Sequence, residues 1–283
     1  MHTDIKDFRR RPQCGVLCRH LPENTQGRDF VVGDLHGCYL ELRALLEMVG
    51  FIPETDRLFC TGDLLHRGPF GRDCLSLLRQ PWFYSVLGNH DTHQMTADEA
   101  EMGLRLAFDA ELSELPMMIH VEGERDFHVL HAELPYQLIF SKESLAGESR
   151  NKHEDIILSG GAPGRVYEVL QKIPSDMLIS DLSDTDRYSL LWGRELWSAT
   201  KKSVSLENPA HYLAYPLRIF CGHSPVARVT RIGYQFFCDT GACFAYTGKK
   251  KMPNRFGLSM VEVATGQVSF IESVTFRQSR YRL

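Results

Sequence analysis

The chain has 283 residues, of which 43% are hydrophobic and 24% charged, and its formal net charge is −4 at pH 7. This length allows one large domain or two small ones with a substantial buried core. The negative balance disfavours general nucleic-acid binding, which depends on a basic surface that releases counterions.

We expect a cytoplasmic protein without nucleic-acid or membrane partners. Residues 1–12 are mostly polar and lack the apolar stretch of a secretory signal. No run of about eighteen apolar residues is present, so the sequence predicts no membrane-spanning helix. The sequence leaves the oligomeric state open.

The eight cysteines are expected to be small buried hydrophobes in a reducing compartment, because several lie in apolar, strand-like runs. Cys14, Cys18 and His20 form a zinc-like pattern. Its spacing is unusual and a fourth ligand is not evident, so we favour buried thiols over a zinc site.

After residues 1–28, which we interpret as a lead-in segment, a strand–loop–helix pattern occurs three times. Strands are predicted at 30–32, 57–60 and 82–87, and helices at 39–49, 73–79 and 92–108. This order indicates parallel strands joined by crossover helices. Polar residues follow each strand, at the carboxyl end where open α/β sheets place their ligand sites.

From residue 117 the pattern changes to shorter strands. These are predicted at 117–121, 127–131, 217–221, 227–232, 234–239, 258–263 and 268–271. They indicate a second, largely antiparallel sheet packed on the first, so the predicted fold class is α/β with two packed sheets. Residues 134–212 form a long polar insert, with helices expected at 166–173 and 190–198, and such inserts often cap a site.

Metal-ligating residue types recur where the predicted strands end. In chain order they are Asp34, His36, Asp63, Asn89, His90, His131 and His223. Carboxylate, amide and imidazole groups are what hard-to-borderline divalent metals prefer. The set suffices for two metals if one carboxylate bridges them, and Asp63 is the natural bridge because it lies between the other two strand ends.

Five sequence blocks resemble the calcineurin-like metallophosphoesterases, in their phosphoprotein phosphatase branch. The blocks, in family order, are Gly33-Asp34-Leu35-His36-Gly37, Gly62-Asp63-Leu64-Leu65-His66-Arg67-Gly68, Gly88-Asn89-His90-Asp91, His131-Ala132 and Gly222-His223-Ser224-Pro225. The resemblance implies two packed mixed β-sheets in a four-layer fold, with a catalytic domain over residues 29–283 and a cap-like insert at about 134–212.

The resemblance also implies how the ligands are shared. One metal is held by Asp34, His36 and His223. The other is held by Asn89 and His131, and Asp63 bridges the two. Mn²⁺ is the expected metal, with Fe, Zn and Mg as open alternatives, since oxygen and imidazole ligands suit all of them.

Further roles follow from the same resemblance. Arg67 is implied to grip phosphate together with Asn89, and His90 to protonate the leaving group. Leu191-Trp192-Gly193-Arg194 resembles the segment of bacterial and phage members, typified by the lambda phage phosphatase, that carries a second phosphate-binding arginine. For Arg194 a surface helix position is the alternative. Asp239, in a block that also resembles these members, is expected to stabilise a turn.

One position departs from the family pattern. Protein phosphatases of this family usually carry an acid immediately before the arginine of the second block, and this chain has His66 there. The usual acid orients the catalytic histidine, so His90 is expected to be held differently, by Asp91 or another carboxylate. The symmetrical diadenosine tetraphosphatases also lack that acid.

The expected function is hydrolysis of phosphoserine and phosphothreonine in proteins or peptides by a metal-activated water, with phosphotyrosine as an open extension. The first alternative is a symmetrical dinucleoside polyphosphate hydrolase with the same metals. A phosphoprotein-binding pseudoenzyme is a third interpretation, which the complete ligand set disfavours.

Overall fold

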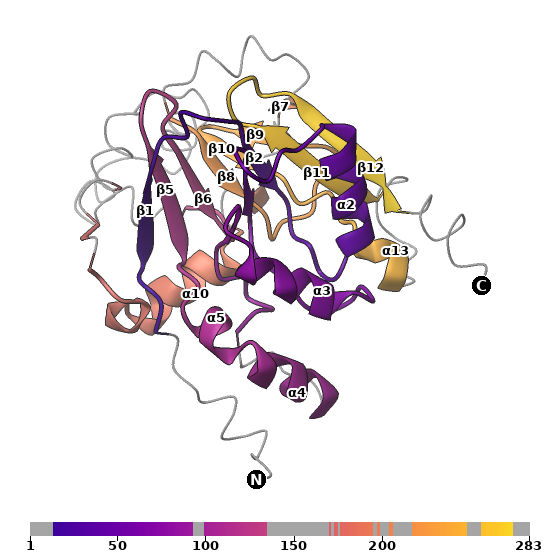
Figure 1. The fold of residues 1–283 in the computed structure, drawn as a ribbon. Helices are drawn as coiled ribbons and strands as arrows, with labels where there is room; N and C mark the ends of the chain where they lie inside the picture. Colours follow the sequence, from indigo (N-terminus) through magenta and orange to yellow (C-terminus); the bar gives the residue numbers. More distant parts are fainter. Residues whose placement is uncertain are drawn as a thin grey trace.

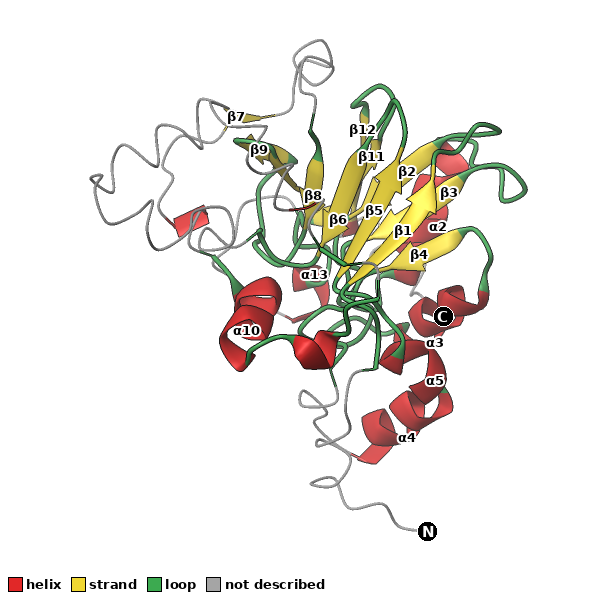
Figure 2. Ribbon diagram, turned by 90° about the vertical axis from the view of Figure 1, so that its left-hand side faces the viewer, coloured by secondary structure: helices red, strands yellow, loops and turns green. Residues whose placement is uncertain are grey.

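The computed structural model describes residues 14–92, 99–134, 170, 173–174, 176–194, 197–198, 204–205, 217–247 and 256–273. Within these ranges the strands form two sheets. Figures 1 and 2 show the strands above a group of helices that lies below both sheets. No helix within the described ranges is long and apolar enough to span a bilayer.

One sheet has five strands. Their order is β12 (Val268–Glu272), β11 (Gly257–Glu262), β2 (Asp29–Val32), β3 (Arg57–Cys60) and β4 (Phe83–Ser85). Strands β2, β3 and β4 run parallel, as the repeated strand–loop–helix pattern predicted. Strands β11 and β12, the last two within the described residues, join this sheet in antiparallel pairing.

The other sheet has seven strands within the described residues. Their order is β1 (Cys18–Pro22), β5 (Met118–Glu122), β6 (Phe127–Leu130), β8 (Ile219–Cys221), β10 (Gln235–Phe237), β9 (Thr230–Ile232) and β7 (Val204–Ser205). Three of its six pairings are parallel, which makes the sheet mixed. The β6–β8 pair is one of these, so both strands end at the same edge.

Apolar residues fill the space between the sheets. Val31 and Phe59 of the first sheet share a buried cluster with Ile119, Val129 and Phe220 of the second. Their neighbours along the strands point the other way, in keeping with the two-residue period of a strand. Those neighbours join a second core with the helices, so the chain forms a helix-flanked β-sandwich, as predicted.

The described residues also form α-helices and short 3₁₀ helices. They are α2 (Tyr39–Met48), α3 (Gly71–Ser76), α4 (Glu99–Ala107), α5 (Asp109–Ser113), α10 (Asp184–Trp192) and α13 (Phe244–Thr247), with short 3₁₀ turns η1 (Leu77–Arg79) and η3 (Ile179–Asp181). Helix α2 packs on β11 and β12. Helices α3, α4 and α5 lie below the sheets on one side of the molecule, and α10 lies on the other side (Figure 2).

Several sequence expectations need correction. The second sheet is mixed rather than largely antiparallel, and β11 and β12 belong to the first sheet. No strand was predicted in residues 1–28, yet β1 forms an edge of the seven-stranded sheet there. The helix expected at 190–198 corresponds to two helical stretches. One is the end of α10, which begins after the Ser183 cap and ends at Trp192, and residues 197–198 are helical again.

Other predicted elements lie partly outside the described residues. The helix predicted at 92–108 is represented by α4, with residues 93–98 outside the described ranges. Two residues of the helix predicted at 166–173 are described: residue 170 is helical and residue 173 lies in a bend. The rest of that helix and most of the proposed cap at 134–212 lie outside the described ranges. The cap therefore stays a prediction.

Candidate metal centre and active site

The six predicted ligands converge where strands of both sheets end. Asp34 and His36 follow β2, Asp63 follows β3, and Asn89 follows β4. His131 and His223 follow β6 and β8 of the other sheet. Each of the six side chains belongs to a residue that is at most 6% exposed. The site therefore lies at the seam between the sheets, where neither sheet alone would complete it.

The backbone at this seam adopts an unusual conformation. Five non-glycine residues among the described ranges have positive φ angles: His36, Asp63, His66, Arg67 and His223, with φ between 42° and 74°. Left-handed backbone is uncommon for such residues and costs free energy that the surrounding fold must supply. All five belong to the sequence blocks that carry the predicted site, so the strain is concentrated where side chains must be aimed.

Two glycines make room for the carboxylates. A Cβ atom at Gly88 would overlap the Asp63 carboxylate and backbone, and one at Gly222 would overlap the Asp34 carboxylate. Only glycine permits the backbone to approach a ligand group this closely. This explains why glycine precedes the ligand in these two blocks.

Asp63 presents one oxygen to each side of the site. Its Oδ2 lies 3.2 Å from His36 Nε2, and its Oδ1 lies 3.6 Å from His131 Nε2. Two groups of potential ligand atoms, His36–Asp63–His90 and Asp34–Asp63–His131, each fall within 4.8 Å, and Asp63 is common to both. This is the position of a bridging carboxylate.

Hydrogen bonds set the tautomers of the two histidines that face Asp63. His36 Nδ1 donates to the Leu65 carbonyl at 2.8 Å, and His131 Nδ1 donates to the Thr61 carbonyl at 2.8 Å. In the neutral rings the Nε2 lone pairs therefore face the site. His131 Nε2 lies 2.8 Å from Asn89 Oδ1, so one acceptor faces another.

Paired acceptors of this kind suit a cation. Burial raises the pKa of Asp34 and of Asp63, and neighbouring carboxylates, Asp239 for the first and Asp91 for the second, raise them further. Burial lowers the pKa of His131 to about 4 and that of His223 to about 2, which keeps both imidazoles neutral. Neutral imidazoles and crowded carboxylates are ligands that a divalent cation stabilises, so the residues present fit two such ions.

The His223 side chain contacts other residues than the resemblance implies, which placed it with Asp34 and His36 around one metal. Its Nδ1 lies 3.0 Å from Asn89 Oδ1, whereas its backbone N–H donates to Asp34 Oδ2 at 3.0 Å. The ring centroids of His223 and His131 are 4.9 Å apart. The imidazole thus lies beside Asn89 and His131, and the hydrogen bond to Asp34 comes from the His223 backbone.

Two arginines flank a cavity of about 270 Å³ beside the ligands. Arg67 approaches His36 Nε2 at 2.8 Å and His90 Nε2 at 3.0 Å. Arg194, just beyond the end of α10, donates to His223 Nε2 at 3.1 Å and to the His223 carbonyl at 2.9 Å. Both line the cavity, so Arg194 lies at the site rather than at a surface helix position, and both guanidinium groups can meet phosphate oxygens.

His90 is linked to a carboxylate through the unusual His66. His90 Nδ1 lies 2.6 Å from His66 Nδ1, and His66 Nε2 is hydrogen-bonded to the Glu101 carboxylate. Because the carboxylate can only accept, His66 Nε2 donates and its Nδ1 accepts from His90. Burial opposes ionisation of Glu101, but His66 and Arg105 outweigh it and lower its pKa.

Glu101 and Arg105 were not predicted as site residues. They are four residues apart on α4 and form an ion pair of 2.8 Å, and Arg105 also donates to the Asp91 carbonyl at 2.6 Å. The i,i+4 spacing of opposite charges was the visible signal, but it is ordinary on helices. The Asp91 carboxylate, one expected partner of His90, instead accepts from the backbone of Leu64 and Gly88.

Asp239 has the expected structural role. Its Oδ1 accepts from the Gly241 N–H at 2.8 Å, and Gly241 has a φ of 71°. A carboxylate that accepts from the backbone two residues ahead is a common way to hold a turn.

Known proteins are similar to this chain at two levels. Serine/threonine-protein phosphatase 1 of Salmonella typhimurium is 28% identical over 221 residues, which cover 76% of this chain and 87% of that protein. The symmetrical bis(5'-nucleosyl)-tetraphosphatase of Methylococcus capsulatus is 50% identical, but over 66 residues, or 23% of this chain and 24% of that protein.

Solved structures show the same fold. A protein serine/threonine phosphatase from Saccharomyces cerevisiae matches with a TM-score of 0.52 at 16% identity, over 95% of this chain and 85% of that one. A candidate diadenosine tetraphosphatase matches with a TM-score of 0.52 at 20% identity, over 91% of this chain and 98% of that one. The family model of the calcineurin-like phosphoesterases matches residues 30–237, and the chain belongs to that family.

Proposed function

We propose that the chain hydrolyses phosphoserine and phosphothreonine esters in proteins with the help of two divalent metal ions. The observation that carries the proposal is the placement of Asp63, which directs one carboxylate oxygen to each of two histidines. The side chains that would hold one ion are Asp34, His36 and Asp63. Those for the other are Asp63, Asn89, His131 and His223.

The metals and the chain's own residues would divide the work. Bound divalent ions would supply Lewis-acid charge and an activated water at neutral pH, and Mn²⁺ is the ion we propose. Arg67 contacts His36, a residue of the first ligand group, and Arg194 contacts His223, a residue of the second. Both guanidinium groups stabilise charge on the phosphoryl oxygens. His90 presents Nε2 to the cavity and donates a proton to the departing oxygen.

The proton on His90 depends on the substrate. Burial, Arg67 and His66 lower the pKa of His90 to about 3 in the ligand-free chain. A phosphate dianion brings negative charge beside the ring and engages Arg67, and both changes favour the imidazolium. Proton donation is thereby coupled to phosphate binding.

Similarity over most of the chain supports a protein substrate. The relative named as a serine/threonine phosphatase aligns with 76% of this chain, whereas the relative named as a tetraphosphatase aligns with 23%. The second candidate function, dinucleoside polyphosphate hydrolysis, is favoured by the higher identity in that shorter segment and by the replacement of the usual acid by His66.

A substrate panel tests these functions. Metal-reconstituted enzyme would be given phosphoserine, phosphothreonine and phosphotyrosine peptides and diadenosine tetraphosphate, with kcat/KM measured for each. Preference for the phosphoserine and phosphothreonine peptides supports the proposal. Preference for the dinucleotide would replace it with the second candidate, and binding of phosphopeptides without turnover would indicate a pseudoenzyme.

We also propose that the protein acts in the cytoplasm. Seven of the eight cysteines are buried, and each of these seven is a free thiol. Burial raises the pKa of Cys18 to about 12, so that thiol stays protonated and unreactive. Unpaired cysteines in this number favour a reducing compartment.

A further inference from the structure

Three histidines form a row across the edge of the seven-stranded sheet, apart from the active site. His20 of β1 pairs in register with His120 of β5, which pairs in register with His128 of β6. Residues Ile119 and Val121 point into the core between the sheets. Because strand side chains alternate, His120 and Glu122 share the opposite, outer face with the other two histidines.

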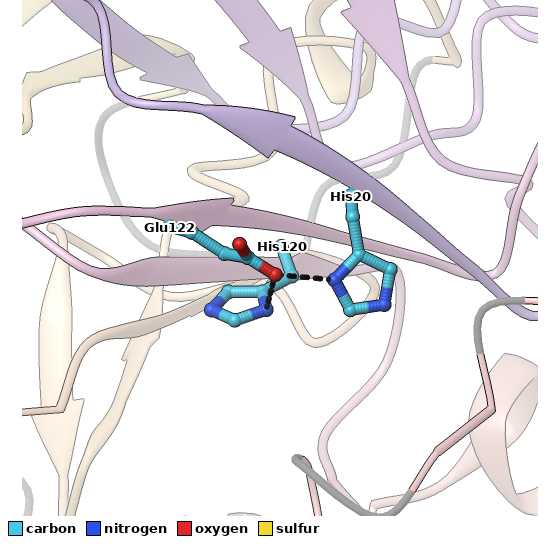
Figure 3. Close-up of side chains that lie close together, drawn as sticks. All are labelled: His20, His120 and Glu122. Atoms are coloured by element: carbon cyan, nitrogen blue, oxygen red, sulfur yellow. Dashed lines mark hydrogen bonds and ion pairs between the residues drawn. The ribbon is translucent and has the colours of Figure 1, made fainter.

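The side chains of this row meet a carboxylate. Glu122 Oε1 lies 2.9 Å from His20 Nδ1 and 3.8 Å from His120 Nδ1. Figure 3 shows the two rings on either side of the Glu122 carboxylate, each with Nδ1 directed to it. One ligand atom from each of the three side chains lies within 4.8 Å of the other two. A small approach of the partly exposed His20 and Glu122 side chains therefore brings all three within reach of one cation, at bonds of about 2.0–2.2 Å.

Asp126 gives His120 the tautomer that a metal ligand needs. The Asp126 carboxylate lies 2.8 Å from His120 Nε2, so Nε2 carries the proton and the Nδ1 lone pair faces His20 and Glu122. A carboxylate behind a ligating histidine is the usual support of a zinc-bound imidazole.

His128 marks the cluster as more than a surface ion pair. Its ring stacks on His120 with centroids 4.1 Å apart, it is 2% exposed, and its Nδ1 has no hydrogen-bond partner among the described residues. That Nδ1 lies 3.9 Å from Asp126 Oδ1. A buried imidazole nitrogen without a partner costs free energy, and a nearby bound ion is one explanation for such a group.

From these contacts we infer that His20, His120 and Glu122 bind a borderline divalent cation of the Zn²⁺ class. Two imidazole nitrogens and one carboxylate oxygen are a ligand set that Zn²⁺ accepts. The side chains of His20 and Glu122 are 29% and 61% exposed, which gives the ion an open path. The ion joins the edge strand β1 to its neighbour β5, so it stabilises the attachment of the N-terminal strand.

Metal content provides the test. The full-length enzyme, loaded with Zn²⁺ and dialysed, is compared with His20→Gln and Glu122→Gln, and with Glu124→Gln as a control for the lost charge at an exposed residue outside the cluster. The expected result is one Zn²⁺ equivalent fewer in the first two variants, with phosphatase activity unchanged in all three. Equal Zn²⁺ content in the wild type and all variants would overturn the inference.

A second variant tests the supporting role of Asp126. Asp126→Asn should weaken Zn²⁺ binding at this site about 10–100-fold, because the amide no longer fixes the His120 tautomer. Isothermal titration of enzyme whose active site is already occupied by Mn²⁺ measures that affinity. Zn²⁺ affinity equal to that of the wild type would contradict the assigned ligand set.

Discussion

His90 reaches the cavity with both ring nitrogens held. Nδ1 lies 2.6 Å from His66 and Nε2 lies 3.0 Å from Arg67. Its backbone N–H donates to Asp63 Oδ1 at 2.8 Å. The ring is thus oriented by His66, which the sequence marked as a departure from the family pattern. The His90 backbone is bonded to Asp63, the carboxylate that we propose bridges the metals.

Replacement of His90 should separate protonation from metal binding. His90→Ala leaves the six ligands in place, so we expect both active-site metals to be retained and kcat on alkyl phosphate esters to fall by about 10²-fold or more. The loss should shrink on p-nitrophenyl phosphate, whose leaving group needs little protonation. Equal losses on the two substrates would argue against a proton donor.

Glu101 should act on His90 through His66. Glu101→Gln keeps an oxygen that can accept from His66 but removes the charge, so we expect kcat on a phosphoserine peptide to fall about 10–100-fold with KM nearly unchanged. Glu101→Asp should recover part of the loss because it restores the charge. Glu111→Gln, which removes an ion-paired carboxylate on α5, is the matched control.

The outcome distinguishes orientation from packing. A purely structural role of Glu101 would lower stability in both variants and reduce activity on good and poor leaving groups alike. A loss confined to poor leaving groups would place Glu101 in the chain of contacts that controls the proton of His90.

At the scale of elements, the loops that precede the central strands are held by local ion pairs. The Asp56 carboxylate accepts from the backbone N–H groups of Arg28 and Ile52 and from the Arg28 side chain at 2.7 Å. Burial alone would raise the pKa of Asp56, but these donors outweigh it and lower the pKa. The contact fixes the start of β2 relative to the start of β3.

Asp56→Asn should therefore destabilise the fold at neutral pH by about 1–3 kcal/mol. Because the folded-state pKa lies below the unfolded value of about 3.9, the wild-type advantage is present above that pH and is lost as the pH falls through the folded pKa. Urea unfolding at pH 7 and near pH 3 measures this, with Glu54→Gln as an exposed control. A difference that does not depend on pH would contradict it.

The central strands could be predicted because they are short apolar runs, each followed by a polar block. Residues 57–60 were predicted as a strand and form β3 with those bounds. Strand β1 was missed because its sequence, Cys-Arg-His-Leu-Pro, has neither an apolar run nor clean alternation. Its pairing with β5 decides its conformation, and such long-range pairing leaves no local signal.

The sheet to which a strand belongs could not be predicted either. The sequences of β11 and β12 predict strands, but they do not indicate which of the two sheets these strands join. In the structure β11 pairs with β2, almost the whole length of the chain away. The same limit applies to Glu101, whose role depends on where α4 lies relative to His66.

At the scale of the whole molecule, the two sheets share one active site. Asp34, Asp63 and Asn89 come from the five-stranded sheet, while His131 and His223 come from the adjacent, parallel strands β6 and β8 of the other. That these six side chains meet could be predicted because each follows its strand directly. Their division between two metals stays a proposal, since the orientation of the His223 ring depends on how the sheets pack.

The most direct measurement is the metal content and turnover of Asp63→Asn, made in the His20→Gln background so that the cluster on β1 and β5 does not contribute. The asparagine keeps an oxygen that can accept from the His90 N–H, so the fold should persist. We expect both active-site metals to bind more weakly and turnover to be abolished, since one carboxylate serves both ions. Two tightly bound metals with near-normal turnover would contradict the bridging role on which the account depends.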